Sequence, residues 1–184
     1  MSLNEPIEQP SSSLLDRLIR SEIGDGGLVH PRASTGSSGG VTRQQRRHHM
    51  AILSSQIERD LLALFGTRRM SEDTDLSAWP LVQKSVLNYG IPDLTGVTSS
   101  GLDLPVLNRE LTEAIRRFEP RLRPETLNVS CHLNEYLRGD LIVKIEALFG
   151  PSDALEAFAM GISICLGSGQ CQKVDPGNSR RRAA

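Results

Sequence analysis

The apolar residues of this chain change their spacing between Pro120 and Pro124, and this change constrains the fold more than any other feature. In two stretches before Pro120 they recur at the period of a helix, about 3.6 residues, and after Pro124 they alternate with polar residues at the period of a strand. Pro120 ends the helical pattern because the residue before a proline is pushed out of the helical region. The sequence therefore predicts an α+β fold, in which two helices pack on one face of a small antiparallel sheet.

Two amphipathic helices are expected before the change. The first covers about 47–65, and Gly66 suits the position just past its end, where a left-handed conformation costs least. The second covers about 104–118, with Asp103 as its N-cap and Pro105 in its first turn. The apolar stripes consist of Leu53, Ile57, Leu61, Leu64 and Phe65 in the first helix and Leu107, Leu111, Ala114, Ile115 and Phe118 in the second.

Three strands are expected after the change. Alternating apolar residues over 127–133 and 141–145 flank a turn around Arg138-Gly139-Asp140, which is typical of a hairpin. A third run, 157–166, has one strongly apolar face. The remaining residues hold almost nothing apolar and include three arginines at 180–182, so we expect 167–184 to be a disordered basic tail.

The N-terminal segment differs from the rest in composition. Residues 1–46 hold 17 Ser, Gly or Pro, too little apolar surface to offset the entropy of ordering, so we expect disorder there and a folded domain over 47–166. One short amphipathic element lies at 13–19. It is either residual amphipathicity in a tail or an anchor that folds onto a partner or onto its own domain. Its apolar face consists of Leu14, Leu15, Leu18 and Ile19.

Residues 66–102 form a long connection that is rich in Gly, Pro, Asp and Ser and has no period. A connection of this length inside a compact domain is usually functional or wrongly assigned. We expect an ordered loop, with a brief helix or strand near 82–87. The apolar side chains expected to pin it are Trp79, Leu81, Val82, Val86, Leu87, Tyr89 and Ile91.

Composition argues against several classes of protein. A formal charge of −1 and an aromatic content of 4% give little basis for nucleic-acid binding. The longest uncharged stretch, 157–172, is too short and too polar to span a bilayer, and residues 1–20 lack the apolar region of a signal peptide. Three cysteines form no disulfide framework, which favours a reduced, cytoplasmic compartment.

The sequence predicts no metal site and no cofactor. Cys131 and His132 are neighbours on a strand, so their side chains point to opposite faces. Cys165 and Cys171 lie six residues apart, and the chain has no C-x-x-C motif. Neither a phosphate-binding glycine motif nor a G-x-S-x-G nucleophile motif occurs.

Paired carboxylates are the one catalytic chemistry that the residues leave open. Glycoside cleavage needs two acids, and Asp93, Asp103, Glu119 and Glu125 are candidates near the second helix and the long loop. A saccharide cleft normally also has aromatic platforms, and this chain offers few. We therefore expect no enzyme, with a peptidoglycan-cleaving, muramidase-like enzyme as the alternative.

The sequence Phe118-Glu119-Pro120-Arg121-Leu122 is the most distinctive local motif. The proline ends a helix between two opposite charges and fixes both in a non-helical geometry. Arg121 offers five donors suited to bidentate recognition, and Glu119 offers a pair of acceptors. Either a partner recognises this exposed corner, or the two side chains form an internal cap. The residues alone leave both interpretations open.

Several motifs together resemble one known family. Their order is an SLLDRL-like segment at 13–19, the loop Ser85-Val86-Leu87-Asn88-Tyr89-Gly90-Ile91-Pro92-Asp93-Leu94, and the Glu-Pro-Arg motif, followed by strands. In this order the chain resembles the small baseplate wedge subunit of type VI secretion systems, TssE, over about 11–166. That family is similar to a baseplate protein of contractile-tailed phages that is often labelled lysozyme-like. The Ser/Gly-rich N-terminal segment and the Arg-rich C-terminus depart from its pattern.

The resemblance implies a structural baseplate component in a six-fold assembly of several proteins, cytoplasmic and docked at the inner membrane. Glu119, Pro120 and Arg121 would dock on the core bundle of the two larger wedge subunits, with Tyr89, Gly90, Pro92 and Asp93 as further partner contacts. The sheet edge would meet the first ring of tail-sheath subunits and help to start sheath polymerisation. An anti-adaptor that shares the fold is a further alternative.

Overall fold

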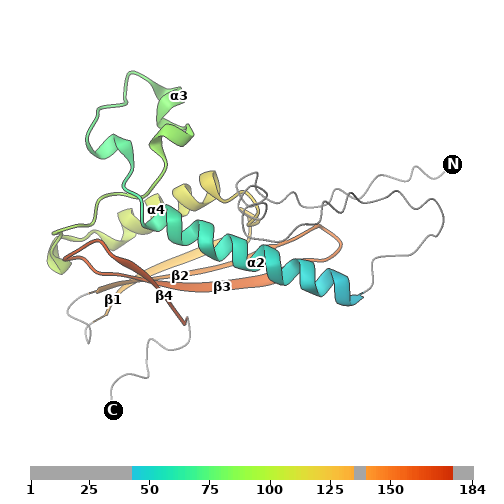
Figure 1. Ribbon diagram of the computed structural model, residues 1–184. Coiled ribbons are helices and arrows are strands. Elements are labelled where there is room, and N and C mark those ends of the chain that lie inside the picture. Colours follow the sequence, from blue (N-terminus) through green and yellow to red (C-terminus); the bar gives the residue numbers. More distant parts are fainter. Residues whose placement is uncertain (1–42, 135–139, 176–184) are drawn as a thin grey trace, which may run out of the picture. The chain divides into compact units, whose positions relative to one another are not determined.

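The computed structural model describes residues 43–134 and 140–175 (Figure 1). The chain divides into two compact units, Met1–Leu53 and Ser54–Ala184, and the boundary falls within helix α2 (Arg43–Phe65). All other described elements belong to the second unit. The first 42 residues, with the amphipathic element at 13–19, lie outside the described residues.

The second unit holds a second long helix and several short turns. Helix α4 (Leu104–Phe118) has the predicted bounds, and the Asp103 side chain caps it by accepting a hydrogen bond from the Val106 amide at 3.0 Å. Helix α2 ends at Phe65 as predicted but begins four residues earlier than expected. Of the brief helix or strand expected near 82–87, the structure shows the helical form, as two turns, α3 (Pro80–Gln83) and η2 (Val86–Asn88). Two more 3-10 turns are η1 (Met70–Glu72) and η3 (Ser99–Gly101).

The strands form one antiparallel sheet in the order β1-β2-β3-β4, which confirms the α+β fold class. The three predicted strands are β1 (Asn128–Asn134), β2 (Asp140–Phe149) and β3 (Glu156–Ile164). The fourth, β4 (Cys171–Val174), was missed, so the prediction of a disordered tail from residue 167 is wrong for this stretch. Its polar side chains gave no alternating pattern, and backbone pairing with Gly161–Ile164 of β3 orders it instead.

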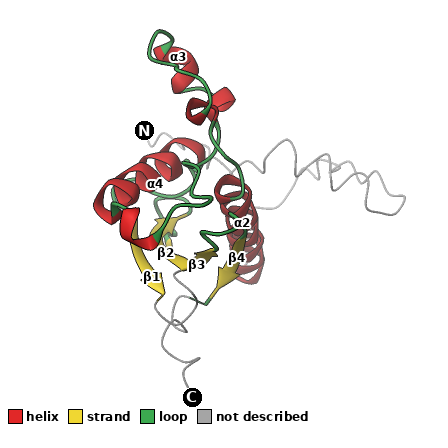
Figure 2. Cartoon of the chain, turned by 90° about the vertical axis from the view of Figure 1, so that its left-hand side faces the viewer, coloured by secondary structure: helices red, strands yellow, loops and turns green. Residues whose placement is uncertain are grey.

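One row of side chains across the sheet shows which face the helices contact. Cys131 pairs with Val143, Val143 with Ile162 and Ile162 with Lys173, so these residues share one face. At one end of the row, the Cys131 thiol lies 3.5 Å from the Asn108 side chain of α4. At the other end, the Lys173 ammonium lies 2.6 Å from Glu58 of α2. Both contacts therefore lie on the same face of the sheet. Figure 2 shows the ribbons of α4 and α2 on one side of the strands.

Most of the buried side chains come from this face and from both helix stripes. Burial of apolar surface contributes about 1.5–3 kcal/mol for each large side chain, so this layer supplies most of the stability. Fully buried members include Ile57 and Leu61 of α2, Leu111 and Ile115 of α4, and Leu141, Ile145, Met160 and Ile162 of the sheet.

Residues 70–88, called the arm here, project away from the sheet (Figure 1). A parallel bridge between Arg68 and Ile91 closes the base of the arm, with the Ile91 amide donating to the Thr67 carbonyl at 2.9 Å and the Arg69 amide donating to the Ile91 carbonyl at 3.0 Å. Gly90 lies at this crossing with φ 125°, and an added Cβ would stand 2.4 Å from the Thr67 carbonyl oxygen. The crossing therefore needs glycine.

The prediction that apolar side chains pin this connection is wrong for most of those named. Trp79, Leu81, Val86 and Leu87 are 57%, 85%, 78% and 65% exposed. Leu76 and Ile91 are buried, and so is the polar Asn88. Sequence patterns count apolar residues but do not show whether a neighbouring element exists to cover them.

Substituting the two glycines separates steric clash from backbone strain. Gly96 also has a positive φ, 75°, but an added Cβ would meet nothing within 4 Å. We expect Gly96→Ala to cost about 1 kcal/mol of unfolding free energy from strain alone and Gly90→Ala roughly 3 kcal/mol, because clash adds to strain. Urea denaturation of both variants measures this, and equal costs would contradict the tight crossing at Gly90.

Candidate functional site

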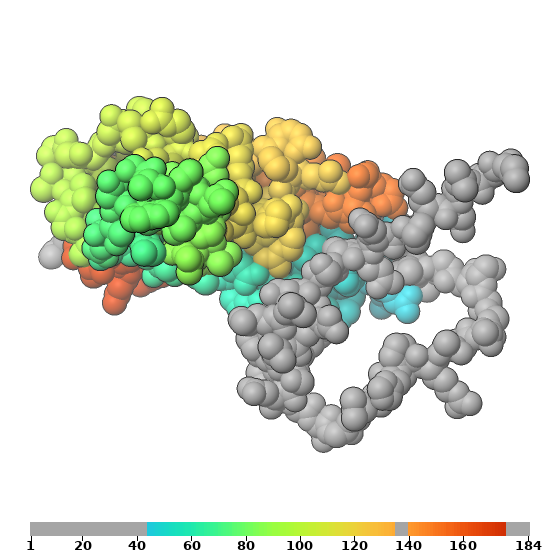
Figure 3. All heavy atoms as spheres, turned by 90° about the horizontal axis from the view of Figure 1, so that it is seen from above, coloured from blue at the N-terminus to red at the C-terminus, as the bar shows by residue number. Residues whose placement is uncertain are grey.

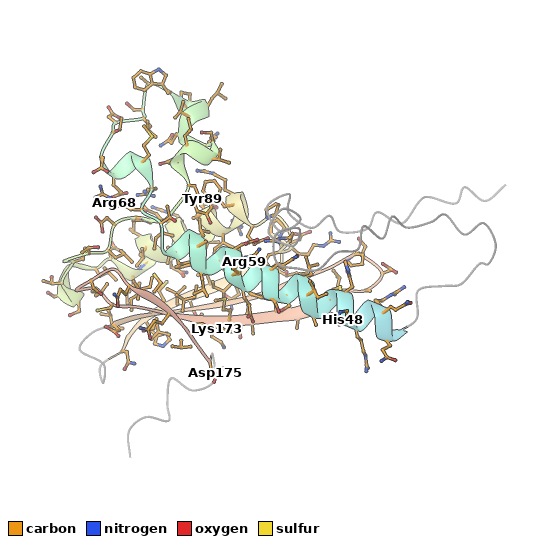
Figure 4. All side chains as sticks on the ribbon, viewed as in Figure 1. His48, Arg59, Arg68, Tyr89, Lys173 and Asp175 are labelled. Atoms are coloured by element: carbon orange, nitrogen blue, oxygen red, sulfur yellow. The ribbon has the colours of Figure 1, made fainter. Side chains whose placement is uncertain are left out.

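Tyr89, the first residue after the arm, joins the loop to both long helices (Figure 4). Its hydroxyl donates to the Asp60 carbonyl of α2 at 3.3 Å. Its ring meets that of Phe118, at the end of α4, edge to face with centroids 5.1 Å apart. Burial, followed by the nearby Asp60 and Glu119 carboxylates, raises the pKa of Tyr89. The phenol therefore stays neutral and can donate this hydrogen bond.

Asp93 orders the chain on the far side of the bridge. One carboxylate oxygen accepts from the Thr95 amide at 2.9 Å, and the other accepts from the Arg68 guanidinium at 3.0 Å. The hydrogen bonds from Thr95, and then those from Arg68, lower the pKa of Asp93. Pro92, half-buried, lies between Asp93 and the bridge.

A pocket of ≈ 230 Å³ lies beside this loop. Its walls come from the end of α2, from the Ile91–Thr95 segment and from the turn between β3 and β4, where Ser168 and Gly169 lie. The charged groups on the wall are Arg68 and Asp93, which pair with each other. The charges of these two pocket-lining side chains therefore neutralise each other.

Glu119 ends helix α4 and is buried, with 2% of its surface exposed. Its amide donates to the Ile115 carbonyl at 2.8 Å. Both carboxylate oxygens accept hydrogen bonds from Arg121, one from Nε and one from a terminal nitrogen, each at 2.5 Å. This fork is the strongest geometry for a guanidinium and a carboxylate. Pro120 between them is exposed.

The same guanidinium also binds Asp60 of helix α2. Asp60 in turn pairs with Arg59, 3.1 Å away, so two cationic and two anionic side chains balance each other. Burial acts to lower the pKa of Arg121, but hydrogen bonds to Glu119 and Asp60 outweigh burial and raise it. Arg121 therefore remains charged at every pH at which the protein folds.

The two sequence motifs thus meet at one place, the corner, which comprises Asp60, Tyr89, Glu119, Pro120 and Arg121. Sequence reasoning missed Asp60 and placed it off the apolar stripe of its helix. The available signal was its spacing, three residues after Ile57 and four before Leu64, which puts it at the border of the buried face. A charged residue at such a border needs a partner from another element.

The expectation of an exposed Glu-Pro-Arg motif is wrong for Glu119. The internal alternative also needs correction, because Glu119 and Arg121 satisfy each other and Asp60 rather than the backbone. What the corner offers to a partner is the exposed Pro120 ring and the part of Arg121, 21% exposed, that faces outward.

The other sequence-derived candidates divide into two groups. Of the four acids considered for glycoside cleavage, Asp93, Asp103 and Glu119 each hold a structural contact, and Glu125 is exposed. Leu14, Leu15 and Leu18 lie outside the described residues.

None of the helices in the part of the chain that the structure describes has the length and apolar character of a membrane span.

Removing the buried carboxylate tests the corner. We expect Glu119→Ala to lower the unfolding free energy by about 3 kcal/mol, because it leaves Arg121 with Asp60 alone. The matched control is Glu113→Ala, which removes an exposed pair with Arg116 at 3.0 Å and should cost less than about 1 kcal/mol. Thermal and urea unfolding measure both, and similar costs would mean that the fork contributes nothing.

Acid titration tests Asp93. Its folded pKa lies below its ordinary value of 3.8, so the carboxylate adds stability above that pH and loses it as the pH falls through the folded pKa. We expect Asp93→Asn to be less stable than wild type at pH 7 and the difference to shrink below pH 3.8. Urea unfolding between pH 2 and 7 measures this, with the exposed Glu125→Gln as control. A constant difference would contradict the assignment.

Comparison with known proteins adds the family. Searches of curated proteins and of solved structures found no match to this chain. A family model described as "Baseplate wedge protein gp25" matches residues 52–151, which is more than half of the chain. The match includes the arm, the corner and the first two strands. TssE, which the sequence resembles, belongs to this family of structural baseplate proteins. The chain is therefore a member of the baseplate wedge protein gp25 family.

Proposed function

We propose that this protein is a structural component of a type VI secretion baseplate and that it docks on the core bundle of the two larger wedge subunits through the corner. The observation that carries the proposal is the meeting of the Tyr-Gly-Ile-Pro-Asp loop and the Glu-Pro-Arg motif at Asp60. A guanidinium held by two carboxylates has lost its freedom to rotate before a partner arrives. Docking onto such a group costs less entropy than docking onto a free arginine.

The proposed contact uses Pro120 and the outer part of Arg121. Glu119 serves it indirectly, because its buried carboxylate fixes the direction of the guanidinium. The loop that carries Tyr89 to the corner comprises Tyr89, Gly90, Pro92 and Asp93. The Tyr89 hydrogen bond, the bridge at Ile91 and the Asp93 hydrogen bond fix its shape. The remaining donor capacity of Arg121 suits a carboxylate or a carbonyl group of the partner.

We also propose that the sheet helps to start polymerisation of the tail sheath by accepting a strand. Among the described strands, β1 and β4 each have one unpaired side. Pairing with β4 covers Gly161–Ile164 and leaves the earlier part of β3 open on that side. An unpaired strand side presents a row of amides and carbonyls to an extended segment of another chain.

The setting proposed for the protein follows from the same assignment. It is a cytoplasmic baseplate docked at the inner membrane, in which several proteins assemble with six-fold symmetry. The partners are the larger wedge subunits and the sheath subunits, without nucleic acid and without insertion of this chain into the bilayer. The element with Leu14, Leu15 and Leu18 is a second candidate contact with these partners.

Co-purification with the two larger wedge subunits tests the docking. We expect wild type and the control Arg116→Ala, which changes an exposed arginine of α4, to co-purify with them. Pro120→Ala should reduce recovery several-fold and Arg121→Ala at least tenfold, about 1.4 kcal/mol, since both face the partner.

Melting curves of the isolated variants separate lost docking from lost folding. A folded Arg121→Ala protein that co-purifies like wild type would contradict the role of the corner. A wild-type protein that does not bind either wedge subunit would contradict the proposed function as a whole.

A further inference from the structure

The arm carries a group of exposed apolar side chains that nothing in the proposed corner uses. Trp79, Leu81, Val86 and Leu87 lie within nine residues of sequence and are each more than half exposed. Leu81 lies in α3 and Val86 and Leu87 in η2, two turns that contact each other, and Trp79 directly precedes α3. Figure 3 looks onto the arm, coloured green, whose atoms form the surface on that side. Soluble proteins rarely expose such a group without a binding role.

The arm is held in one shape by polar contacts, so this exposure is not the result of a loose loop. The buried Asn88 side chain accepts from the Ser71 amide at 2.9 Å and donates to the Gln83 carbonyl at 3.1 Å, which ties the two sides of the arm together. The Ser85 hydroxyl accepts from the Leu87 amide at 3.2 Å. An apolar surface held in advance loses little entropy when a partner covers it.

The arm is also continuous with the corner. Arg117 of α4, which lies two residues before Glu119, donates to the Gln83 carbonyl at 3.2 Å. Tyr89 follows Asn88 directly and packs on Phe118. A partner that covers Pro120 and Arg121 therefore lies next to the base of the arm.

The charges around the apolar group indicate what covers it. Lys84 lies between Leu81 and Val86 and, among the residues that the structure describes, forms no ion pair. Arg117 adds a second cation, while Glu72 and Asp73 are already paired with Arg69 and Arg68. Asp75 remains, held by the Ser77 amide at 2.9 Å, and burial of its ionised carboxylate in the hydrocarbon of a bilayer is costly.

We infer that the arm inserts its apolar side chains into a groove between helices of the same wedge partner that the corner contacts, with carboxylates on the rim of the groove facing Lys84 and Arg117. The inference rests on the proposed function and adds a second contact to it. A helix bundle offers such grooves between neighbouring helices. In the complex, the arm would bury apolar surface, and the fixed guanidinium of Arg121 at the corner would orient the partner.

Trp79 is the single tryptophan of the chain, so it reports directly on this contact. Protein labelled with 5-fluorotryptophan gives one ¹⁹F resonance. We expect this resonance to shift when unlabelled wedge subunits bind. We also expect a soluble paramagnetic agent to broaden it less in the complex than in the free protein. A complex that forms with an unchanged resonance would overturn the inference and leave the docking at the corner intact. If no complex forms, both the inference and the proposed function fail.

Substitutions give an independent measure. We expect the double variant Leu81→Ser/Leu87→Ser to weaken binding at least tenfold with an unchanged melting temperature, because both side chains are exposed in the free protein. The control Leu155→Ser removes an exposed leucine, 44% exposed, near the start of β3 and should bind like wild type. Lys84→Glu should weaken binding and reverse its dependence on salt.

Membrane binding is the other outcome that these assays distinguish. Vesicles of phosphatidylethanolamine and phosphatidylglycerol contain no tryptophan, so a blue shift of Trp79 emission on mixing would report insertion. We expect no shift. A shift together with wild-type affinity of the double variant for the wedge subunits would overturn the inference in favour of a bilayer contact.

Discussion

Arg121 joins the end of α4 to α2 through one guanidinium group. It forks onto the carboxylate that ends α4, and it reaches Asp60 on α2, so two helices distant in sequence share one cation. Tyr89 reaches the same residue of α2 from the long connection. The direction in which the chain leaves α4, and therefore the start of β1, depends on this group being paired. An unpaired carboxylate at the buried position of Glu119 would cost more than the motif contributes.

Every charge in the corner has a partner within the protein, so the residues proposed to bind the wedge subunits also stabilise the fold. Pro120 stops the helix and at the same time presents its ring to solvent. Family membership supports a structural role in a baseplate. A motif of this kind is sensitive to substitution for two reasons, and stability measurements are needed to separate them.

The amino-acid sequence was sufficient to predict the helices and three strands, because each carries a repeated pattern over many residues. The bounds of α4 followed from Asp103 and Pro120, which mark its ends by local chemistry. Strand β4 could not be predicted in this way, since its four residues carry no repeated apolar pattern and become a strand through pairing with β3. The corner was half predictable. Its two motifs stood out, but their meeting at Asp60 depends on contacts across 61 residues of chain, and no local pattern reports such contacts.

The closed base of the arm has a consequence for how such proteins can diverge. The bridge between Arg68 and Ile91 brings the two ends of the connection together. The helices and the sheet therefore contact the same crossing whatever the length or sequence of the arm. Additional residues beyond a closed crossing cost little, since the entropy of a loop grows slowly with its length. The segment can therefore be lengthened, shortened or exchanged while the sheet and helices stay as they are. Relatives built on one framework could therefore vary this segment, and with it the wedge contact that we propose for the arm.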